Sequence, residues 1–236
     1  MRSKSNRKDK SFFAQTLVAS IWFVLAFTFS CSSDNDSNSS SSGGGHSSSS
    51  SGGGGTFKDD RDSKSYKWVK IGEQTWMAEN LNYRGTEPDT LGICYGNDPD
   101  NCTKYGRLYT WTSAMDVCPS SWHLPSEEEW DKLEASVRST FGCTVSNEEC
   151  LKAKTGWYNN GNGTDGFGFT ALPGGYGFEG EFYEEGKLGV FWGSSEEHEL
   201  PWGLEDWGYF RDIGYNSNGH GYNEKTNMFS VRCLKN

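Results

Sequence analysis

The chain has 236 residues and a formal net charge of −10, and aromatic residues make up 15% of it. The first 30 residues hold five basic side chains and a single acidic one, so the remainder of the chain carries a charge of −14. A surface this acidic repels phosphate backbones, which argues against a nucleic-acid-binding protein.

The N-terminal segment has the organisation of a secretory signal peptide. A basic head leads into a mostly apolar run over residues 12–29, which is followed by Ser30 and Cys31. Bacterial lipoproteins are cut just before a cysteine that then receives lipid, so we predict a signal peptide over residues 1–30 and a lipid anchor at Cys31. Thr28 stands where lipoproteins usually carry Leu. The alternative is an uncleaved membrane anchor, because about 20 apolar residues span a bilayer.

Residues 31–56 are almost entirely Ser, Gly, Asn and Asp. Such a composition buries too little apolar surface to offset the entropy lost on ordering, so we predict a flexible linker that holds the domain away from a membrane. Ser32 follows the predicted anchor directly, which is typical of lipoproteins sorted to the outer membrane. The expected location is therefore the cell envelope, with an outer-membrane lipoprotein as the predicted form.

Residues 57–236 are of single-domain length and contain six of the seven cysteines. An even number of cysteines in an exported chain indicates a disulfide framework, for which fifteen pairings are possible. We expect two short bridges across turn-rich loops and one long bridge between the remaining cysteines: Cys94–Cys102, Cys143–Cys150 and Cys118–Cys233.

The first predicted elements of the domain are short. Apolar and polar residues alternate over residues 66–71 and 74–77 on either side of Gly72, which predicts a β-hairpin. Apolar residues then recur at helical spacing over residues 108–117, and Pro119 follows as a stop, so we predict a helix there.

The strongest helix signal begins at Ser126. Ser126 and Glu129 have the spacing of a capping box, in which each side chain accepts from the other residue's backbone N–H. Trp130, Leu133 and Val137 then fall on one face, which predicts a helix that packs against the core.

Beyond Thr155, glycines and aromatic residues dominate the sequence. Glycines permit tight turns and aromatic rings fill the space between loops, so we predict short strands and loops without long helices. The last predicted strand covers residues 228–234, with Phe229, Val231 and Cys233 on one face.

Several motifs, in order along the chain, resemble the signature of the Fibrobacter succinogenes major paralogous domain family. They occupy residues 66–72, 74–83, 105–111, 117–119, 122–126, 129–130, 166–167, 171–175 and 230–233. This family is similar to the superfamily of formylglycine-generating enzymes and C-type lectins. The resemblance implies an α+β fold with small twisted antiparallel sheets, two helices and a large irregular loop region. It also implies a disulfide between a mid-chain and a C-terminal cysteine.

The same resemblance does not imply catalysis. Formylglycine-generating enzymes bind copper through two cysteines near the C-terminal part of the domain, and this chain offers Cys233 alone in that region. The residues also provide no identifiable pair of nucleophile and base, so we do not predict an enzyme.

Aromatic residues crowd a Gly-rich, acidic stretch near the C-terminus, where no regular apolar period would bury all of them. Aromatic rings stack on sugar faces, and nearby carboxylates accept hydrogen bonds from hydroxyls. The candidate ligand-binding residues are Trp192, Trp202, Trp207, Tyr209 and Phe210.

Two loops rich in Asn and Asp provide weak candidates for calcium, through Asp98, Asp100 and Asp165, because hard cations prefer several oxygen ligands. Turn formation explains both loops equally well. No other cofactor is predicted.

Three functions stay open at this point. The first is a non-catalytic binding or adhesion module displayed from the envelope, with a polysaccharide or a protein as ligand. The second is a structural envelope protein without a fixed ligand, and the third is an oxidoreductase or hydrolase.

Overall fold

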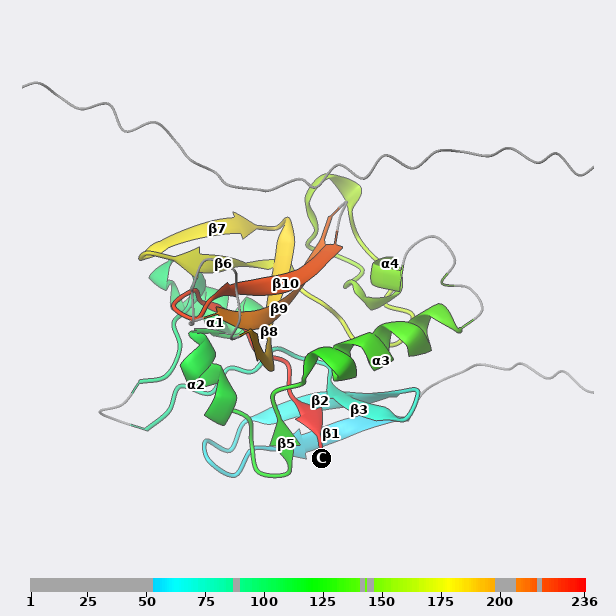
Figure 1. Ribbon diagram of the computed structural model, residues 1–236, viewed down its shortest axis with the longest axis horizontal. Helices are drawn as coiled ribbons and strands as arrows, with labels where there is room; N and C mark the ends of the chain where they lie inside the picture. Colours follow the sequence, from blue (N-terminus) through cyan, green and yellow to red (C-terminus); the bar gives the residue numbers. More distant parts are fainter. Residues whose placement is uncertain (1–52, 87–89, 141–142, 144–146, 198–206, 216–217) are drawn as a thin grey trace, which may run out of the picture. The chain divides into compact units, whose positions relative to one another are not determined.

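The computed structural model describes residues 53–86, 90–140, 143, 147–197, 207–215 and 218–236. The predicted signal peptide, the anchor at Cys31 and the candidate Trp202 lie outside these residues. The described part is an α+β unit with two sheets and few helices, as Figure 1 shows. None of its helices has the length and hydrophobicity that a bilayer crossing requires.

The smaller sheet has five antiparallel strands. In spatial order they are β1 (Gly54–Lys58), β2 (Ser65–Ile71), β3 (Gln74–Met77), β12 (Leu234–Lys235) and β5 (Trp122–His123). The predicted hairpin is confirmed, because Ile71 pairs with Gln74 and Gly72 takes a positive φ of 59° in the turn. β1 includes residues 54–56, which the sequence assigns to the linker. They pair with β2, and Gly55 lies so close to the Trp68 ring that a Cβ would come within 2.9 Å of it.

The larger sheet is mixed and has seven strands. They are β10 (Asn218–Glu224), β9 (Trp207–Gly214), β8 (Leu188–Glu197), β11 (Phe229–Ser230), β4 (Leu108–Tyr109), β6 (Gly174–Phe178) and β7 (Glu181–Glu185). The long β8–β9–β10 meander is antiparallel, whereas β11 and β6 each pair with β8 in parallel. The glycine- and aromatic-rich half therefore forms strands, as predicted, and its described residues contain only one short 3₁₀ helix, η2 (Tyr158–Asn160).

Four α-helices occur in the described residues, rather than the two that the resemblance implies. They are α1 (Pro99–Tyr105), α2 (Trp111–Asp116), α3 (Glu127–Arg138) and α4 (Asn147–Leu151), and a 3₁₀ helix, η1 (Tyr95–Asn97), precedes α1. α1 forms where the sequence shows an acidic loop, because Asp98 caps it and Pro99 occupies its first position.

Helix α3 lies between the two sheets (Figure 1). Its predicted capping box is present, and Trp130, Leu133 and Val137 are buried as the spacing requires. The Trp130 ring contacts Trp76 of β3 at a centroid distance of 4.8 Å and Phe191 of β8 at 5.8 Å. The apolar face of this helix therefore joins the cores of both sheets.

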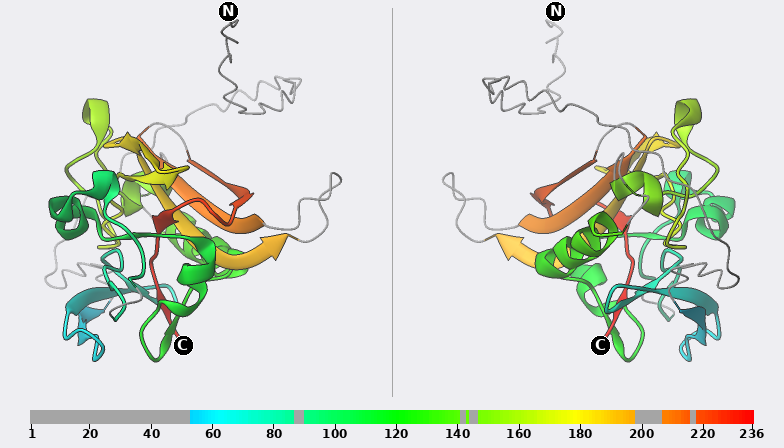
Figure 2. Two further views of the ribbon diagram at one scale, coloured as in Figure 1. Left: turned by 90° about the vertical axis from the view of Figure 1, so that its left-hand side faces the viewer. Right: turned by 90° about the vertical axis from the view of Figure 1, so that its right-hand side faces the viewer.

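Two predicted elements are wrong in their extent. The helix predicted over residues 108–117 begins only at Trp111, because Leu108 and Tyr109 pair with β11 as strand β4. The strand predicted over residues 228–234 is divided into β11 and β12, because the chain crosses there from the larger to the smaller sheet (Figure 2). Phe229, Val231 and Cys233 nevertheless belong to one core cluster.

Arg232 lies in this crossing segment and has no solvent-exposed surface. Its guanidinium donates to Asn80 Oδ1 from Nη2 at 2.6 Å and from Nε at 3.1 Å, and to the carbonyl oxygens of Phe169 and Thr170. It also stacks over the Phe169 ring, 4.4 Å from the centroid. Burial lowers the pKa of Arg232, although a guanidinium keeps its charge at neutral pH.

The Thr170 carbonyl is held toward Arg232 by an unusual backbone conformation. Thr170 has φ of 55°, which a β-branched residue rarely adopts. Asp165 fixes it, because its carboxylate accepts from the Thr170 backbone N–H at 2.7 Å and from the Thr170 hydroxyl at 2.8 Å. The Asp165 side chain thus orients one of the acceptors of Arg232.

We predict that Arg232→Met lowers the free energy of unfolding by about 3–5 kcal/mol, because it leaves buried carbonyl and amide oxygens without donors. Denaturant titration of the variant measures this loss. Arg138→Met, on the exposed side of α3, serves as the control and should change stability by less than about 0.5 kcal/mol. Full stability in Arg232→Lys would contradict the role of the planar guanidinium.

Candidate functional site

The three disulfides pair as predicted: Cys94–Cys102, Cys118–Cys233 and Cys143–Cys150. The long bridge joins the loop before β5 to the segment between β11 and β12. All six cysteines of the described domain are therefore in bridges, and Cys233 has no thiolate to offer a metal ion.

The structure corrects two of the aromatic candidates. Trp192 and Tyr209 have no exposed surface, so neither ring can stack on a ligand. Trp192 donates its indole N–H to the Tyr109 carbonyl at 2.7 Å. The two rings belong to different core clusters, because both faces of the β8–β9 pair are covered. Trp207 and Phe210 are half-buried.

Two of the three carboxylates suggested for calcium already accept hydrogen bonds from the backbone. Asp98 accepts from the Asp100 N–H at 3.0 Å as the cap of α1, and Asp165 accepts from Thr170. Among the described residues, no group of three or more His, Cys, Asp or Glu side chains is arranged to hold a metal ion. Calcium at these two loops stays a prediction.

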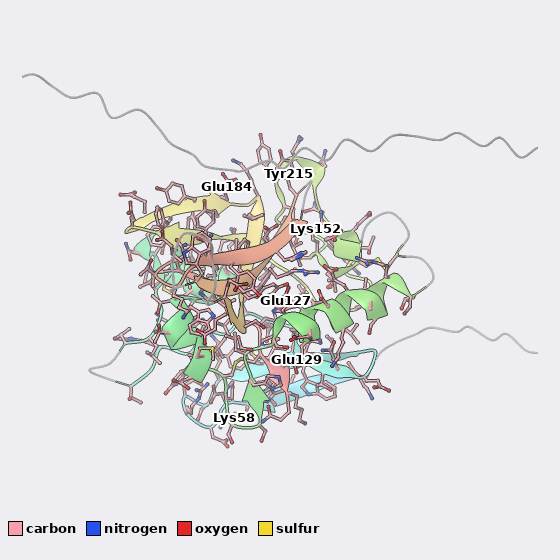
Figure 3. The ribbon with its side chains drawn as sticks, in the orientation of Figure 1. Lys58, Glu127, Glu129, Lys152, Glu184 and Tyr215 are labelled. Carbon is pink, nitrogen blue, oxygen red and sulfur yellow. A yellow bond between two sulfur atoms is a disulfide. The ribbon has the colours of Figure 1, made fainter. Side chains whose placement is uncertain are left out.

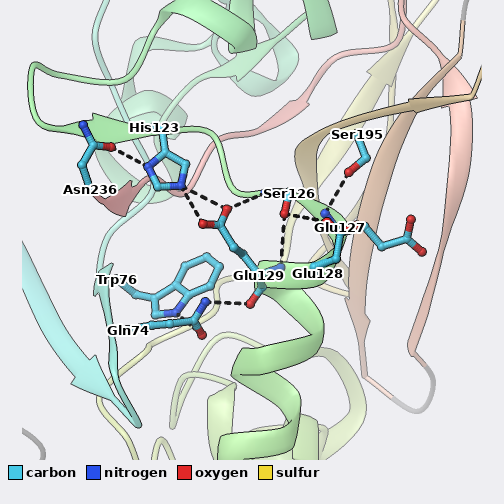
Figure 4. A network of polar contacts seen from close by, with 9 residues as sticks. All are labelled: Gln74, Trp76, His123, Ser126, Glu127, Glu128, Glu129, Ser195 and Asn236. Atoms are coloured by element: carbon cyan, nitrogen blue, oxygen red, sulfur yellow. Dashed lines mark hydrogen bonds and ion pairs between the residues drawn. The ribbon is translucent and has the colours of Figure 1, made fainter.

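A polar network surrounds the start of α3, and Figure 4 shows it from close by. His123 Nε2 lies 3.0 Å from both carboxylate oxygens of Glu129, and His123 Nδ1 lies 2.6 Å from Asn236 Oδ1. The Glu129 carboxylate also accepts from the Ser126 N–H at 2.8 Å, and the Gln74 amide donates to the Glu129 carbonyl.

The contacts of this network stabilise the start of α3. The Ser126 hydroxyl accepts from the Glu129 N–H and donates to Glu128, so it is not directed at His123 as a nucleophile would be. The pKa of Glu128 is lowered by hydrogen bonds from its own backbone N–H and from the Ser126 hydroxyl. His123 instead extends the capping box to β5 and ties the helix start to the smaller sheet.

A cleft of about 120 Å³ lies between the smaller sheet and α1. Its walls come from residues 64–66 at the start of β2, residues 79–82 after β3, residues 102–106 at the end of α1, and Leu172. Tyr66, residues 79–82, residues 105–106 and Leu172 belong to stretches that carry the family resemblance, whereas residues 64–65 and 102–104 lie outside them.

Each wall of the cleft is fixed by specific contacts. The buried Tyr66 hydroxyl accepts from the Asn82 backbone N–H at 3.1 Å, and the Glu79 carboxylate accepts from the Lys67 N–H at 2.8 Å. Asn80 binds Arg232 through Oδ1 and donates to the Tyr105 carbonyl at 2.8 Å. The buried guanidinium therefore supports the wall from behind.

The α1 wall depends on close packing and on a disulfide. Gly106 has φ of 78°, and a Cβ there would come within 2.8 Å of Asn80 and of the Leu81 carbonyl, so only glycine fits. The Asn82 amide donates to the Cys102 carbonyl at 2.8 Å, and the Cys94–Cys102 bridge closes the loop that contains η1 and most of α1.

The lining of the cleft combines charged and neutral polar groups. The Lys64 and Lys104 ammonium groups are donors, and the Glu79 carboxylate is an acceptor with one oxygen bound to the backbone. Thr103 adds an exposed hydroxyl, whereas Tyr66 and Tyr105 border the cavity as buried residues. Such a cavity suits a small polar ligand that carries both hydrogen-bond donors and acceptors.

A second exposed feature lies at the end of the larger sheet where β7 leads into β8. Tyr158 exposes 55% of its surface and meets Tyr215 edge to face at 5.6 Å. Lys187 lies 5.7 Å from the Tyr158 ring and pairs with Glu184 at 3.5 Å. Figure 3 labels Glu184 and Tyr215 along this margin of the sheet.

We predict that Ser126→Ala and His123→Ala each lower the free energy of unfolding by about 1 kcal/mol, because each removes part of the α3 cap. The double variant should cost less than the sum of the two, since both residues act through Glu129. Chemical denaturation measures all three. Ser136→Ala, at a half-buried serine of α3 away from the cap, is the matched control, and additive losses would contradict a shared network.

Removing Cys94–Cys102 should release the α1 wall of the cleft. The double serine variant is expected to lose about 2.5 kcal/mol of stability and to lose amide protection at residues 102–106 in hydrogen exchange. The Cys143–Cys150 pair spans 7 positions against 8, so its double variant should lose similar stability and keep that protection. Equal amide protection of residues 102–106 in both variants would show that the Cys94–Cys102 bridge does not hold the α1 wall.

Comparison with known proteins gives one match. Residues 69–235 match the Fibrobacter succinogenes major domain, which is more than half of the chain. No curated protein and no solved structure matches the chain. The chain therefore belongs to the Fibrobacter succinogenes major domain family.

Proposed function

We propose that this protein is a non-catalytic carbohydrate-binding module, displayed from the cell envelope on its Ser/Gly-rich linker and held there by lipid at Cys31. The observation that carries the proposal is the composition of the cleft between the smaller sheet and α1. The export signal and the linker composition support the location.

Sugar hydroxyls both donate and accept hydrogen bonds, and a sugar ring also has apolar faces. In the cleft, Glu79 accepts from such hydroxyls, and Lys64 and Thr103 donate to them. The rings of Tyr66 and Tyr105 border the cleft but expose only 1% and 4% of their surfaces, so hydrogen bonds rather than ring stacking would carry the recognition. A protein side chain or an isolated ion would use only part of this set.

The cleft is also formed before any ligand arrives. The Cys94–Cys102 bridge and the contacts of Arg232 with Asn80 hold two of its walls, and Tyr66 is 99% buried in the third. A rigid site loses little side-chain and loop entropy when a ligand binds, so a small contact area is sufficient for measurable affinity. Exposed Tyr158 provides a further stacking surface for a longer sugar chain.

The bridges also favour binding over oxidation chemistry. We place the domain with the C-type-lectin-like and formylglycine-generating-enzyme folds, as the sequence resemblance implies. In a fold of that kind, a copper site would need the thiolate of Cys233. Cys233 is bonded to Cys118, so it has no thiolate to bind copper. We therefore propose the cleft as the binding site, in place of the aromatic surface first expected around Trp192.

We predict that the full-length protein binds a subset of polysaccharides in a glycan array or an affinity pull-down, and that Glu79→Gln weakens this binding about tenfold. A hydrogen bond to a charged acceptor contributes about 1.5–3 kcal/mol, and the amide keeps the shape of the side chain. The matched control is Glu73→Gln in the exposed β2–β3 turn, which should bind as the natural protein does.

Two outcomes would redirect the proposal. If Trp207→Ala abolishes binding and Glu79→Gln does not, the ligand lies at the β8–β9 strands, as the aromatic pattern first indicated. If no polysaccharide binds, the proposal fails and a structural envelope role without a fixed ligand replaces it.

A further inference from the structure

The lining of the cleft carries a small excess of positive charge in a strongly acidic chain. Two of its three charged lining residues are the cations Lys64 and Lys104, and the third is Glu79. The whole chain has a formal net charge of −10. A concentration of positive charge in such a background marks a place where a negative group is attracted rather than repelled.

A third cation lies directly behind the wall of the cleft. The guanidinium of Arg232 binds Asn80, whose side chain lines the cavity. All of its hydrogen-bond acceptors are neutral, since they are an amide oxygen and the carbonyls of Phe169 and Thr170. No carboxylate contacts it, although Asp165 and Glu79 act on the guanidinium from farther away, so its positive charge is offset only in part at the cleft.

Lys64 is the cation best placed to take a ligand's negative group. Within the described residues it forms no ion pair, and its Nζ lies 5.8 Å from the centre of the Tyr66 ring. Lys104, in contrast, already has Glu185 as a partner at 3.6 Å. Burial lowers the pKa of Lys64, and Arg107 lowers it further, while Asp62 and Glu79 act in the opposite direction. A negative group beside Lys64 would relieve this unfavourable environment.

Glu79 determines which groups of the ligand can lie on the side of the cleft away from Lys64. One of its carboxylate oxygens accepts from the Lys67 backbone N–H, which fixes the orientation of the side chain in the cleft. A carboxylate repels a second negative group but accepts well from hydroxyls. The ligand must therefore carry its charge on one side and its hydroxyls on the other.

We propose that the cleft takes a carboxylated sugar, a uronate or a related acidic monosaccharide unit, with its carboxylate toward Lys64 and its hydroxyls toward Glu79. This inference rests on the proposed carbohydrate-binding function and adds the chemical class of the ligand. Lys64 is the residue that distinguishes the acid from its neutral counterpart, and Lys104 assists from the α1 wall.

Isothermal titration of the full-length protein with matched ligands tests the inference. The probes are glucuronate and glucose, galacturonate and galactose, and acetate as a carboxylate without hydroxyls. We expect at least one acid to bind tenfold or more tightly than its neutral partner. Binding of that acid should weaken with added salt, because its main contact is electrostatic.

Lys64→Gln should abolish this preference, so that the variant binds the acid and its neutral partner with similar affinity. Lys70→Gln, at an exposed lysine of β2, is the matched control and should keep the preference. Thermal unfolding of both variants checks that the fold is retained, which is expected because the Lys64 side chain forms no ion pair among the described residues.

The outcomes separate the two proposals. Equal binding of acid and neutral sugars, or a preference that survives Lys64→Gln, overturns the acidic ligand and leaves carbohydrate binding in place. Acetate binding as tightly as the uronates would reduce the cleft to a simple anion site and also overturn the inference. Absence of binding to every sugar and polysaccharide overturns both.

Discussion

The fold depends on one buried charge. Arg232 is fully buried between the two sheets, and its guanidinium is surrounded by the carbonyls of Phe169 and Thr170 and by the Asn80 amide. A charge without such dipoles would cost several kcal/mol to bury, so the three acceptors must be in place whenever the protein is folded. Two of the connected segments are irregular, one after β3 and one before β6, and the third is the crossing from β11 to β12. One side chain thus gives fixed conformations to loops that have no regular hydrogen-bond pattern of their own.

Arg232 is connected to the cleft by a few direct contacts. Asn80 is at once a partner of Arg232 and a wall of the cavity, and Asp165 holds Thr170 in a strained conformation on the other side of the guanidinium. The Cys118–Cys233 bridge fixes the residue that follows Arg232. Residues within the signature segments therefore have two roles. Their contacts build the scaffold, and the same contacts position polar groups at the surface. A rigid scaffold of this kind suits the proposed binding function, which needs no reactive side chain.

Local patterns predicted their elements well, whereas burial and the cleft depend on contacts that no local pattern contains. The β2–β3 hairpin and the α3 capping box were predictable because alternation and capping involve neighbouring residues, and the short disulfides because they close short loops. Trp192 and Tyr209 were misjudged because helix α3 and the C-terminal crossing cover the two faces of their strands. The cleft was missed because its walls come from four separate segments. The one available signal was the polar Glu79, Asn80 and Asn82, which interrupt an otherwise apolar stretch.

The distribution of charge further limits what such a cleft can hold. Charges outside the first 30 residues sum to −14, and the field of this surface extends over about 8 Å at physiological ionic strength. A ligand with one carboxylate at Lys64 gains from this cation and is opposed by the nearby Asp62 and Glu79. A polymer with a negative charge on every unit gains the same contact but brings its other charges against an acidic surface, and each of these repulsions subtracts from binding. For the proposed carbohydrate ligand, the arrangement therefore favours acidic sugars that are terminal or widely spaced along a chain, because only these present a single charge to the cleft at a time.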